Sequence, residues 1–200
     1  IKQAVGPKLV GYSYPLPVLK LDFGSASSPT TNLHDSSNFT LQVRQPERKL
    51  DSVILPERTK SQLESVVTLI QKSKLIFDDW GMRNVLGNVT NFAVNLYGPP
   101  GTGKTITAEA LAGELGRGFL LVNYAQLESK FVGETPKNIE RAFDIAENEG
   151  ALLFFDEADS FLGQRITEVR QSADYAVNVT RSVMMIRLER FNGIAVFATN

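Results

Sequence analysis

Short apolar runs alternate with amphipathic segments along residues 50–200. The runs are continuous enough to predict buried strands at Phe92–Tyr97, Gly118–Asn123, Ala151–Phe155 and Gly193–Ala198. Between these runs, apolar residues recur at helical spacing, which predicts helices over 106–115, 136–149 and 176–190. This alternation of strands and helices favours an α/β/α sandwich in which a parallel sheet is connected by right-handed crossovers.

The chain before residue 50 follows no such period. Residues 24–38 are rich in Ser, Thr, Pro and Asn, which is typical of a loop or linker, whereas Phe39–Val43 is expected to form a short strand. We therefore divide the chain into an N-terminal segment over residues 1–49 and an α/β domain over residues 50–200. The segment is predicted to be irregular or part of a small β-rich module.

A phosphate-binding loop follows the first predicted strand of the domain. Residues Gly98–Thr105 read GPPGTGKT, a complete G-x-x-x-x-G-K-[ST] motif. Its glycines let the backbone come close to a ligand and turn N–H groups inward, and the next helix adds its positive end. Lys104 can reach the β- and γ-phosphates, and the Thr105 hydroxyl can bind Mg²⁺. The alternative is a Gly/Pro-rich turn between two core elements, which the strand before it and the helix after it disfavour.

Two carboxylates end the third predicted strand, in the run Phe154-Phe155-Asp156-Glu157-Ala158-Asp159. The carboxyl end of a buried parallel strand lies at the ligand crevice of an α/β sheet, so these groups would face the phosphates. Asp156 would hold Mg²⁺ and Glu157 would act as general base on the attacking water. The alternative is that both acids only cap the following helix. The fourth strand ends at the same edge in a polar amide, Asn200.

Composition narrows the function classes further. The 200 residues carry a net charge of −1, with 42% hydrophobic and 22% charged residues, and contain no cysteine. Disulfides and thiolate metal sites are therefore excluded, and a reducing, cytoplasmic location is expected. No dense Lys/Arg cluster points to nucleic acid, and no apolar run is long enough for a membrane segment. Because the chain begins with Ile1 and ends in a predicted strand, we expect it to be a fragment.

Four blocks in this order resemble the classical AAA ATPases, a family within the AAA+ superfamily. Gly98–Thr105 resembles Walker A, Lys130–Thr135 the first pore loop, Phe154–Asp159 Walker B and Ala198–Asn200 sensor 1. The resemblance covers about residues 50–200 and implies the large subdomain of a P-loop NTPase, cut after sensor 1 and without the helical lid.

The resemblance also implies a role for each matching residue. Lys104, Glu157 and Asn200 would be catalytic, with Asn200 sensing the γ-phosphate. Mg²⁺ would be held by Thr105 and Asp156. ATP or ADP would be bound by Gly98, Pro99, Pro100, Gly101, Thr102, Gly103, Lys104, Thr105, Ile106 and Asp156. Residues 52–55 align with the segment that lines the adenine but lack its usual glycine pair, so the adenine contacts stay open.

We infer the process that ATP hydrolysis would drive from the loop formed by Lys130, Phe131, Val132 and Gly133. In the resembling family an aromatic residue at this position lines the channel of a hexameric ring and grips a polypeptide. The aromatic face of Phe131 can contact many kinds of side chain, although Phe131 can also be read as a core aromatic. Gln164–Asp174 lies where a second pore loop would lie, or is a solvated charged face.

The resemblance therefore implies a homo-hexameric, Mg²⁺-dependent ATPase that remodels, unfolds or translocates protein substrates. A nucleic-acid-associated loader or helicase-like ring and a nucleotide-gated scaffold are the alternatives. The arginine finger, the second sensor and the lid of the family would follow Asn200. We therefore expect the isolated chain to be weakly active or inactive as an ATPase.

Overall fold

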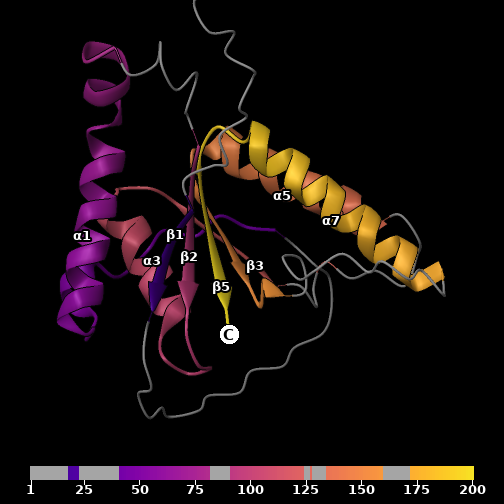
Figure 1. Ribbon diagram of the computed structural model, residues 1–200, viewed down its shortest axis with the longest axis horizontal. Coiled ribbons are helices and arrows are strands. Elements are labelled where there is room, and N and C mark those ends of the chain that lie inside the picture. The colour runs from indigo at the N-terminus through magenta and orange to yellow at the C-terminus, as the bar shows by residue number, and fades with distance from the viewer. Residues whose placement is uncertain (1–17, 23–40, 82–90, 124–126, 128–133, 160–171) are drawn as a thin grey trace, which may run out of the picture.

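The chain folds around a five-stranded parallel sheet with helices on both faces (Figure 1). The computed structural model describes residues 18–22, 41–81, 91–123, 127, 134–159 and 172–200. The strands are β1 (Val18–Asp22), β2 (Phe92–Tyr97), β3 (Phe119–Asn123), β4 (Leu152–Asp156) and β5 (Ile194–Thr199). The helices are η1 (Leu50–Ser52), α1 (Glu57–Gln71), η2 (Leu75–Asp79), α3 (Lys104–Glu114), α5 (Glu134–Glu149) and α7 (Ser172–Arg190). The strand order is β1-β2-β5-β4-β3, which confirms the predicted parallel α/β/α architecture.

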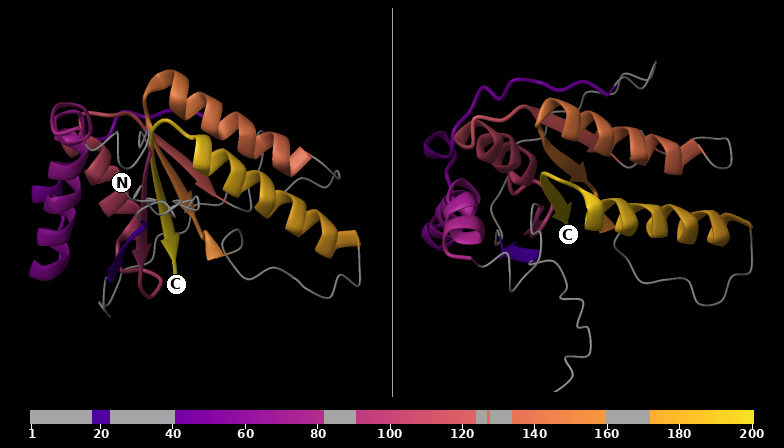
Figure 2. Two further views of the ribbon diagram at one scale, coloured as in Figure 1. Left: turned by 45° about the horizontal axis from the view of Figure 1, so that its top comes forward. Right: turned by 90° about the horizontal axis from the view of Figure 1, so that it is seen from above.

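Two apolar clusters fill the space between the sheet and its helical layers. One lies under α1 and α3 and includes Leu63, Val94 and Leu111. The other lies under α5 and α7 and includes Phe143 and Phe155. Figure 2 shows α5 and α7 side by side on one face, with α1 and α3 on the other. Because both faces are covered, β4 and β5 are buried along nearly their whole length, which explains their continuous apolar sequences.

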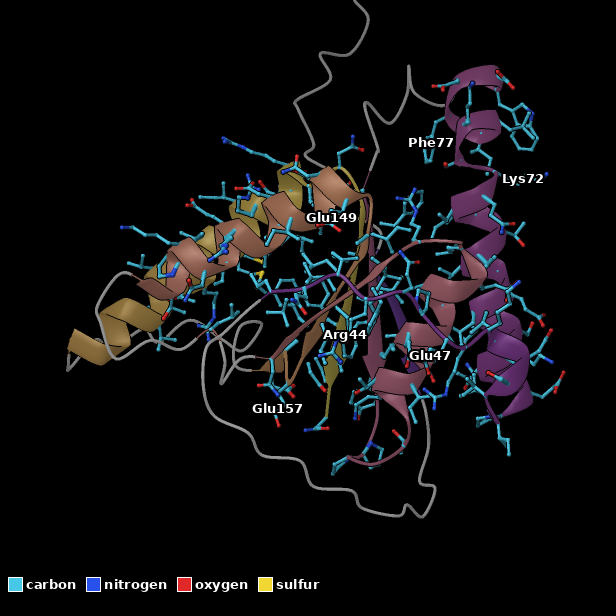
Figure 3. All side chains as sticks on the ribbon, turned by 180° about the vertical axis from the view of Figure 1, so that it is seen from behind. Arg44, Glu47, Lys72, Phe77, Glu149 and Glu157 are labelled. Carbon is cyan, nitrogen blue, oxygen red and sulfur yellow. The ribbon has the colours of Figure 1, made fainter. Side chains whose placement is uncertain are left out.

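Residues 41–50 run across the edge of the domain and contact both α3 and β3 (Figure 3). Arg44 donates a backbone hydrogen bond to the carbonyl of Phe119 at 2.9 Å and accepts one in return at 2.8 Å. Gly113 on α3 permits the close approach, because a Cβ there would lie 2.0 Å from the carbonyl oxygen of Arg48. The described parts of the N-terminal segment thus pack on the α/β domain, and its treatment as a separate unit stays a prediction.

The N-terminal segment contains a strand that the sequence pattern did not predict. β1 pairs in parallel with β2, from Val18 opposite Ala93 to Asp22 opposite Tyr97, and forms one edge of the sheet. The strand predicted at 39–43 is wrong for its described part, since residues 41–43 form no strand and only an isolated bridge follows at Arg44. A strand needs a partner, and a partner distant in sequence cannot be read from local alternation.

The predicted helices are confirmed, with ends that differ by a few residues. The helix expected from Pro136 begins at Glu134, because proline is tolerated in a first helical turn. The helix expected from Ala176 begins at Ser172. Among the described helices, none has the length and apolar character needed to cross a membrane.

Candidate functional site

The phosphate-binding loop lies between β2 and α3, at the carboxyl edge of the sheet (Figure 1). The backbone N–H of Gly98 donates to the carbonyl of Thr199 at 3.2 Å, which ties the start of the loop to the end of β5. Gly103 caps α3 in the left-handed conformation with φ +86°, which only glycine adopts without strain. The loop is therefore fixed at both ends, and α3 begins at Lys104 with its N-terminus directed to the loop.

Lys104 folds back into the loop that precedes it. Its Nζ donates to the carbonyl of Gly98 at 2.5 Å, to the carbonyl of Pro99 at 3.0 Å and to Oδ1 of Asn200 at 3.0 Å. Burial lowers the pKa of the Lys104 ammonium, an effect opposed by the charges of Asp156 and Asp159. An ammonium group held by neutral carbonyl and amide oxygens can exchange them for the negatively charged oxygens of a phosphate at a modest cost in free energy. A lysine that binds phosphate has to make this exchange.

Thr105 and Asp156 meet although they are far apart in sequence. The Thr105 hydroxyl donates to Oδ2 of Asp156 at 3.1 Å, and Oδ1 of Asp156 accepts the backbone N–H of Glu157 at 3.0 Å. Asp156 is thus oriented from both sides. The pairing with Thr105 joins two hard oxygen donors, one hydroxyl and one carboxylate. These residues fit Mg²⁺, which is usually held by one or two protein oxygens together with substrate phosphates.

Glu157 has the one positive φ of a residue other than glycine among the described residues, at 54°. Such a conformation is uncommon outside glycine and, when the surroundings impose it, is often found at functional sites. The residue that follows it is held in place, since the backbone N–H of Ala158 donates to the carbonyl of Ala198 at 2.8 Å. Glu157 is exposed at the end of β4 (Figure 3). The turn therefore presents a carboxylate to solvent at the carboxyl end of β4.

Two further polar residues at this edge were given no role from the sequence. Oδ2 of Asp159 accepts the backbone N–H of Asn200 at 3.1 Å, so the turn after β4 holds the end of β5. Oδ1 of Asn95 accepts the Thr199 hydroxyl at 3.1 Å, which connects β2 to β5. The available signal was one polar residue within the apolar run of β2, and a third acid in the block that ends β4.

The remaining predicted site residues are Ile106 and those of the two predicted pore loops. Ile106 lies on the first turn of α3 and is 45% exposed. The loop Lys130–Gly133 lies outside the described residues, as does Gln164–Gln171 of the second predicted pore loop. The structure thus joins the phosphate-binding loop, the carboxylates after β4 and Asn200, and leaves the predicted pore loops untested.

Comparison with known proteins gives matches of sequence and of fold. The profile of the ATPase family associated with various cellular activities (AAA) matches residues 94–200, more than half of the chain. Protein SAV of Sulfolobus acidocaldarius is 31% identical over 169 residues, which cover 80% of this chain and 21% of that protein. The 26S proteasome subunit RPT4 of Saccharomyces cerevisiae is 33% identical over 144 residues, which cover 70% of this chain and 31% of that protein.

Among solved structures, the crystal structure of the FIGL-1 AAA domain matches with a TM-score of 0.59 at 23% identity. This match covers 80% of the present chain and 50% of that chain, and at this identity it is a likeness of fold. The chain spans about a fifth of the length of one curated relative above and about a third of the other.

Proposed function

The chain belongs to the AAA family of ATPases, and from this premise we propose that the carboxyl edge of its sheet binds ATP with Mg²⁺ and hydrolyses it. The observation that carries the proposal is the 3.1 Å hydrogen bond between the Thr105 hydroxyl and the Asp156 carboxylate. It places the two proposed metal-binding residues side by side, next to the loop that holds Lys104. A loop that only bound phosphate would need no carboxylate at that point.

Lys104 and the loop backbone would bind the phosphates. The Lys104 ammonium would leave the carbonyls of Gly98 and Pro99 for the β- and γ-phosphates, while the loop N–H groups and the positive end of α3 face the same charge. Thr105 and Asp156 would hold Mg²⁺, which when bound neutralises charge on the phosphate oxygens. ADP would occupy the same loop, so the site would hold either nucleotide.

Glu157 would accept a proton from the attacking water. Its exposed carboxylate follows β4 directly, and its backbone N–H donates to the carboxylate of Asp156, the proposed metal-binding residue. Asn200 would contact the γ-phosphate, since its side-chain oxygen already lies 3.0 Å from the Lys104 ammonium. The end of β5 would then report on whether the γ-phosphate is present.

Substitution Glu157→Gln tests the catalytic proposal. It keeps the size and polarity of the side chain but removes the base, so ATP turnover should fall by about 10²- to 10⁴-fold while ATP binding survives. Turnover is measured by phosphate release in the full-length protein, and binding by calorimetry with ATP and Mg²⁺. Glu149→Gln is the matched control, because Glu149 is exposed at the opposite end of the fold (Figure 3). Equal turnover in both variants would remove Glu157 from the reaction.

Beyond hydrolysis, we propose that the whole protein uses ATP to remodel, unfold or translocate polypeptides as a homo-hexamer. The proposal is supported by family membership and by the block Lys130–Thr135 in the position of a pore loop. Phe131→Ala should abolish processing of an unfolded model substrate while ATP binding is kept, and Phe131→Tyr should retain processing because the aromatic face remains. Processing by the alanine variant at the native rate would contradict the proposed substrate contact.

The isolated 200-residue chain is proposed to be a weak ATPase. In the family an arginine from a neighbouring subunit completes the site, and such arginines contribute about 10³- to 10⁵-fold in GTPases. Turnover of the chain should therefore stay low when light scattering shows a monomer. High turnover by a verified monomer would mean that the site is complete without a neighbour.

A further inference from the structure

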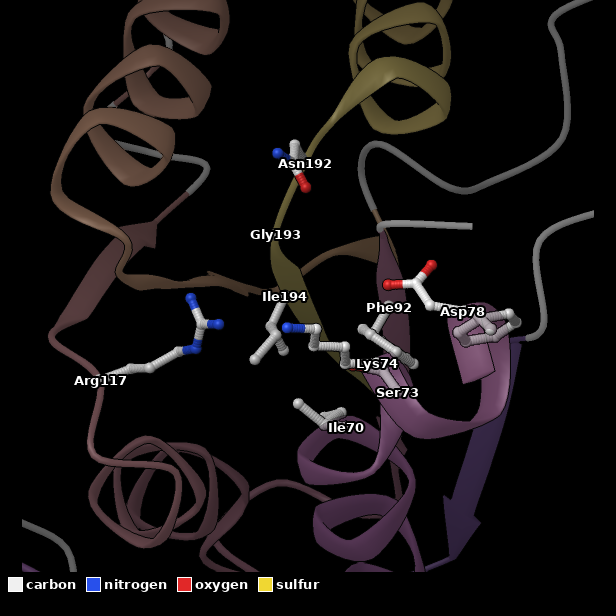
Figure 4. Close-up of a pocket in the computed structure, with 10 residues that line it drawn as sticks. Ile70, Ser73, Lys74, Asp78, Phe92, Arg117, Asn192, Gly193 and Ile194 are labelled. Atoms are coloured by element: carbon white, nitrogen blue, oxygen red, sulfur yellow. The ribbon is translucent and has the colours of Figure 1, made fainter. Parts of the chain in front are cut away.

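A second cavity opens at the amino ends of β2 and β5, at the edge of the sheet opposite the phosphate-binding loop (Figure 4). Its volume is about 240 Å³. Buried apolar side chains of Ile70, Phe77 and Ile194 form part of its lining. The cavity shares none of its lining residues with the proposed ATP site, so a ligand here would be separate from the nucleotide.

Two cations from distant parts of the chain converge on this cavity. Lys74 comes from the turn between α1 and η2, and Arg117 from the connection between α3 and β3. Figure 4 shows both side chains reaching toward the amino end of β5 from opposite sides. Within the described part of the chain, neither cation has a carboxylate within 4.0 Å.

The guanidinium of Arg117 retains most of its donor capacity. Among the described residues it makes one side-chain hydrogen bond, from Nη1 to the carbonyl of Gly150 at 3.0 Å. A guanidinium carries five N–H donors in a planar fork that matches the two oxygens of a carboxylate or phosphate. The Gly150 contact holds the side chain in place, so the remaining donors are preorganised for a ligand.

The rest of the polar lining consists of neutral side chains and one acidic side chain. Asn192 and Ser73 add an amide and a hydroxyl, while Asp78 is the one acidic side chain in the lining. In Figure 4 the Asp78 carboxylate lies on the far side of Lys74 from Arg117. The positive charge of the lining is therefore gathered at the Lys74–Arg117 end.

We propose that this cavity binds a small oxyanion ligand, a carboxylate or a phosphate monoester, with its charged group between Lys74 and Arg117. The apolar lining would receive a short hydrocarbon portion and, by keeping part of the water away, would strengthen the ion pairs. The volume is below the range of drug-sized pockets, so the ligand has only a few heavy atoms besides its charged group. Binding would be favoured by the charges of Arg117 and Lys74.

Residue-resolved NMR separates this cavity from the ATP site. Amide spectra of the 200-residue chain are recorded during titration with inorganic phosphate, acetate or butyrate, against sodium chloride at equal ionic strength. The amide of Gly193 reports on the cavity, and the amide of Gly103 reports on the phosphate-binding loop. We expect a saturable shift at Gly193 with phosphate or with a carboxylate. Tighter binding of butyrate than of acetate would assign the ligand to the carboxylate class with an apolar tail.

Variants that remove a positive charge from the lining test whether Lys74 and Arg117 bind the oxyanion. Lys74→Met and Arg117→Met should each weaken binding at Gly193 by about tenfold, as the loss of a charge-assisted hydrogen bond predicts. Lys72→Met is the control, because Lys72 is exposed in the same connection between α1 and η2 but does not line this cavity. The spectra also show whether each variant is folded.

The proposal is overturned if phosphate and both carboxylates leave Gly193 unshifted, or shift it no more than chloride does. It is also overturned if the shift persists unchanged in Lys74→Met and Arg117→Met, which would show nonspecific ion binding. If one cation variant fails to fold, the other cation variant decides the outcome.

Discussion

The cationic side chains at the two edges of the parallel sheet have different surroundings. At the carboxyl edge, the Lys104 ammonium is enclosed by two loop carbonyls and the amide of Asn200. At the amino edge, Lys74 and Arg117 line an open cavity, and the one internal bond of Arg117 there goes to the carbonyl of Gly150. At the carboxyl edge the cation already has hydrogen-bond partners within the protein. At the amino edge, N–H donors are directed to space that a ligand can enter.

The difference follows from where the chain turns. At the carboxyl edge, one short loop runs directly into α3, so consecutive residues supply the lysine, the backbone N–H groups and the hydroxyl. At the amino edge, the polar groups come from separate connections whose residues meet only because the strands start together. A continuous site leaves a motif in the sequence, and a discontinuous site does not.

The largest effect is expected from a substitution that changes the carboxyl edge alone. Lys104→Met removes the enclosed cation, and ATP turnover of the full-length protein should fall by about 10²- to 10³-fold because transition-state charge loses its main side-chain partner. Phosphate-release assays measure this. The oxyanion response of Gly193 should stay at its native level in the same variant. A parallel loss at both edges would mean that the edges are coupled and not independent.

A smaller effect separates backbone geometry from ligand contact. Gly103 and Gly116 both have positive φ, at 86° and 64°, and a Cβ at either position would meet no atom within 4 Å. Gly103→Ala and Gly116→Ala should therefore lower the free energy of unfolding by a similar amount, about 1–2 kcal/mol. Only Gly103→Ala should also weaken ATP binding, because it lies in the loop. Urea unfolding and calorimetry provide the two measurements, and equal ATP affinity in both variants would contradict the role of the loop backbone.

The smallest effect is a dependence of stability on pH that belongs to Lys104. Burial lowers its pKa in the folded chain below the ordinary value of 10.5, so between the two values the unfolded chain binds more protons than the folded chain. Stability attributable to Lys104 should therefore rise as the pH increases toward 10.5. The difference in free energy of unfolding between the native chain and Lys104→Met, measured in urea along the pH series, isolates this contribution. A difference that stays constant with pH would show that the ammonium is not destabilised by burial.

Most of the α/β architecture could be predicted from local patterns. The apolar runs at 151–155 and 193–198 are buried strands because both faces of the sheet are covered, and that burial removes polar residues from the sequence itself. The loop Gly98–Thr105 was readable for a similar reason, since each required residue type stands at a fixed spacing. These features depend on neighbours in sequence.

The strand Val18–Asp22 and the bond between Thr105 and Asp156 depend on neighbours in space. β1 was missed because pairing with β2 across a long separation decides whether an apolar stretch is a strand, and the same rule removed the strand expected near residue 41. The contacts of Asp159 and Asn95 could not be read from their own segments, because their partners Asn200 and Thr199 both lie at the end of β5.

By itself the sequence determined a phosphate-binding loop, two carboxylates after a buried strand and an amide at the end of another. The tertiary structure decided that these groups meet at one edge, and that the opposite edge gathers Lys74 and Arg117 around a cavity. The physical reason is that backbone conformation and burial act on adjacent residues, whereas the distance between two side chains on different strands is fixed only when the sheet is assembled.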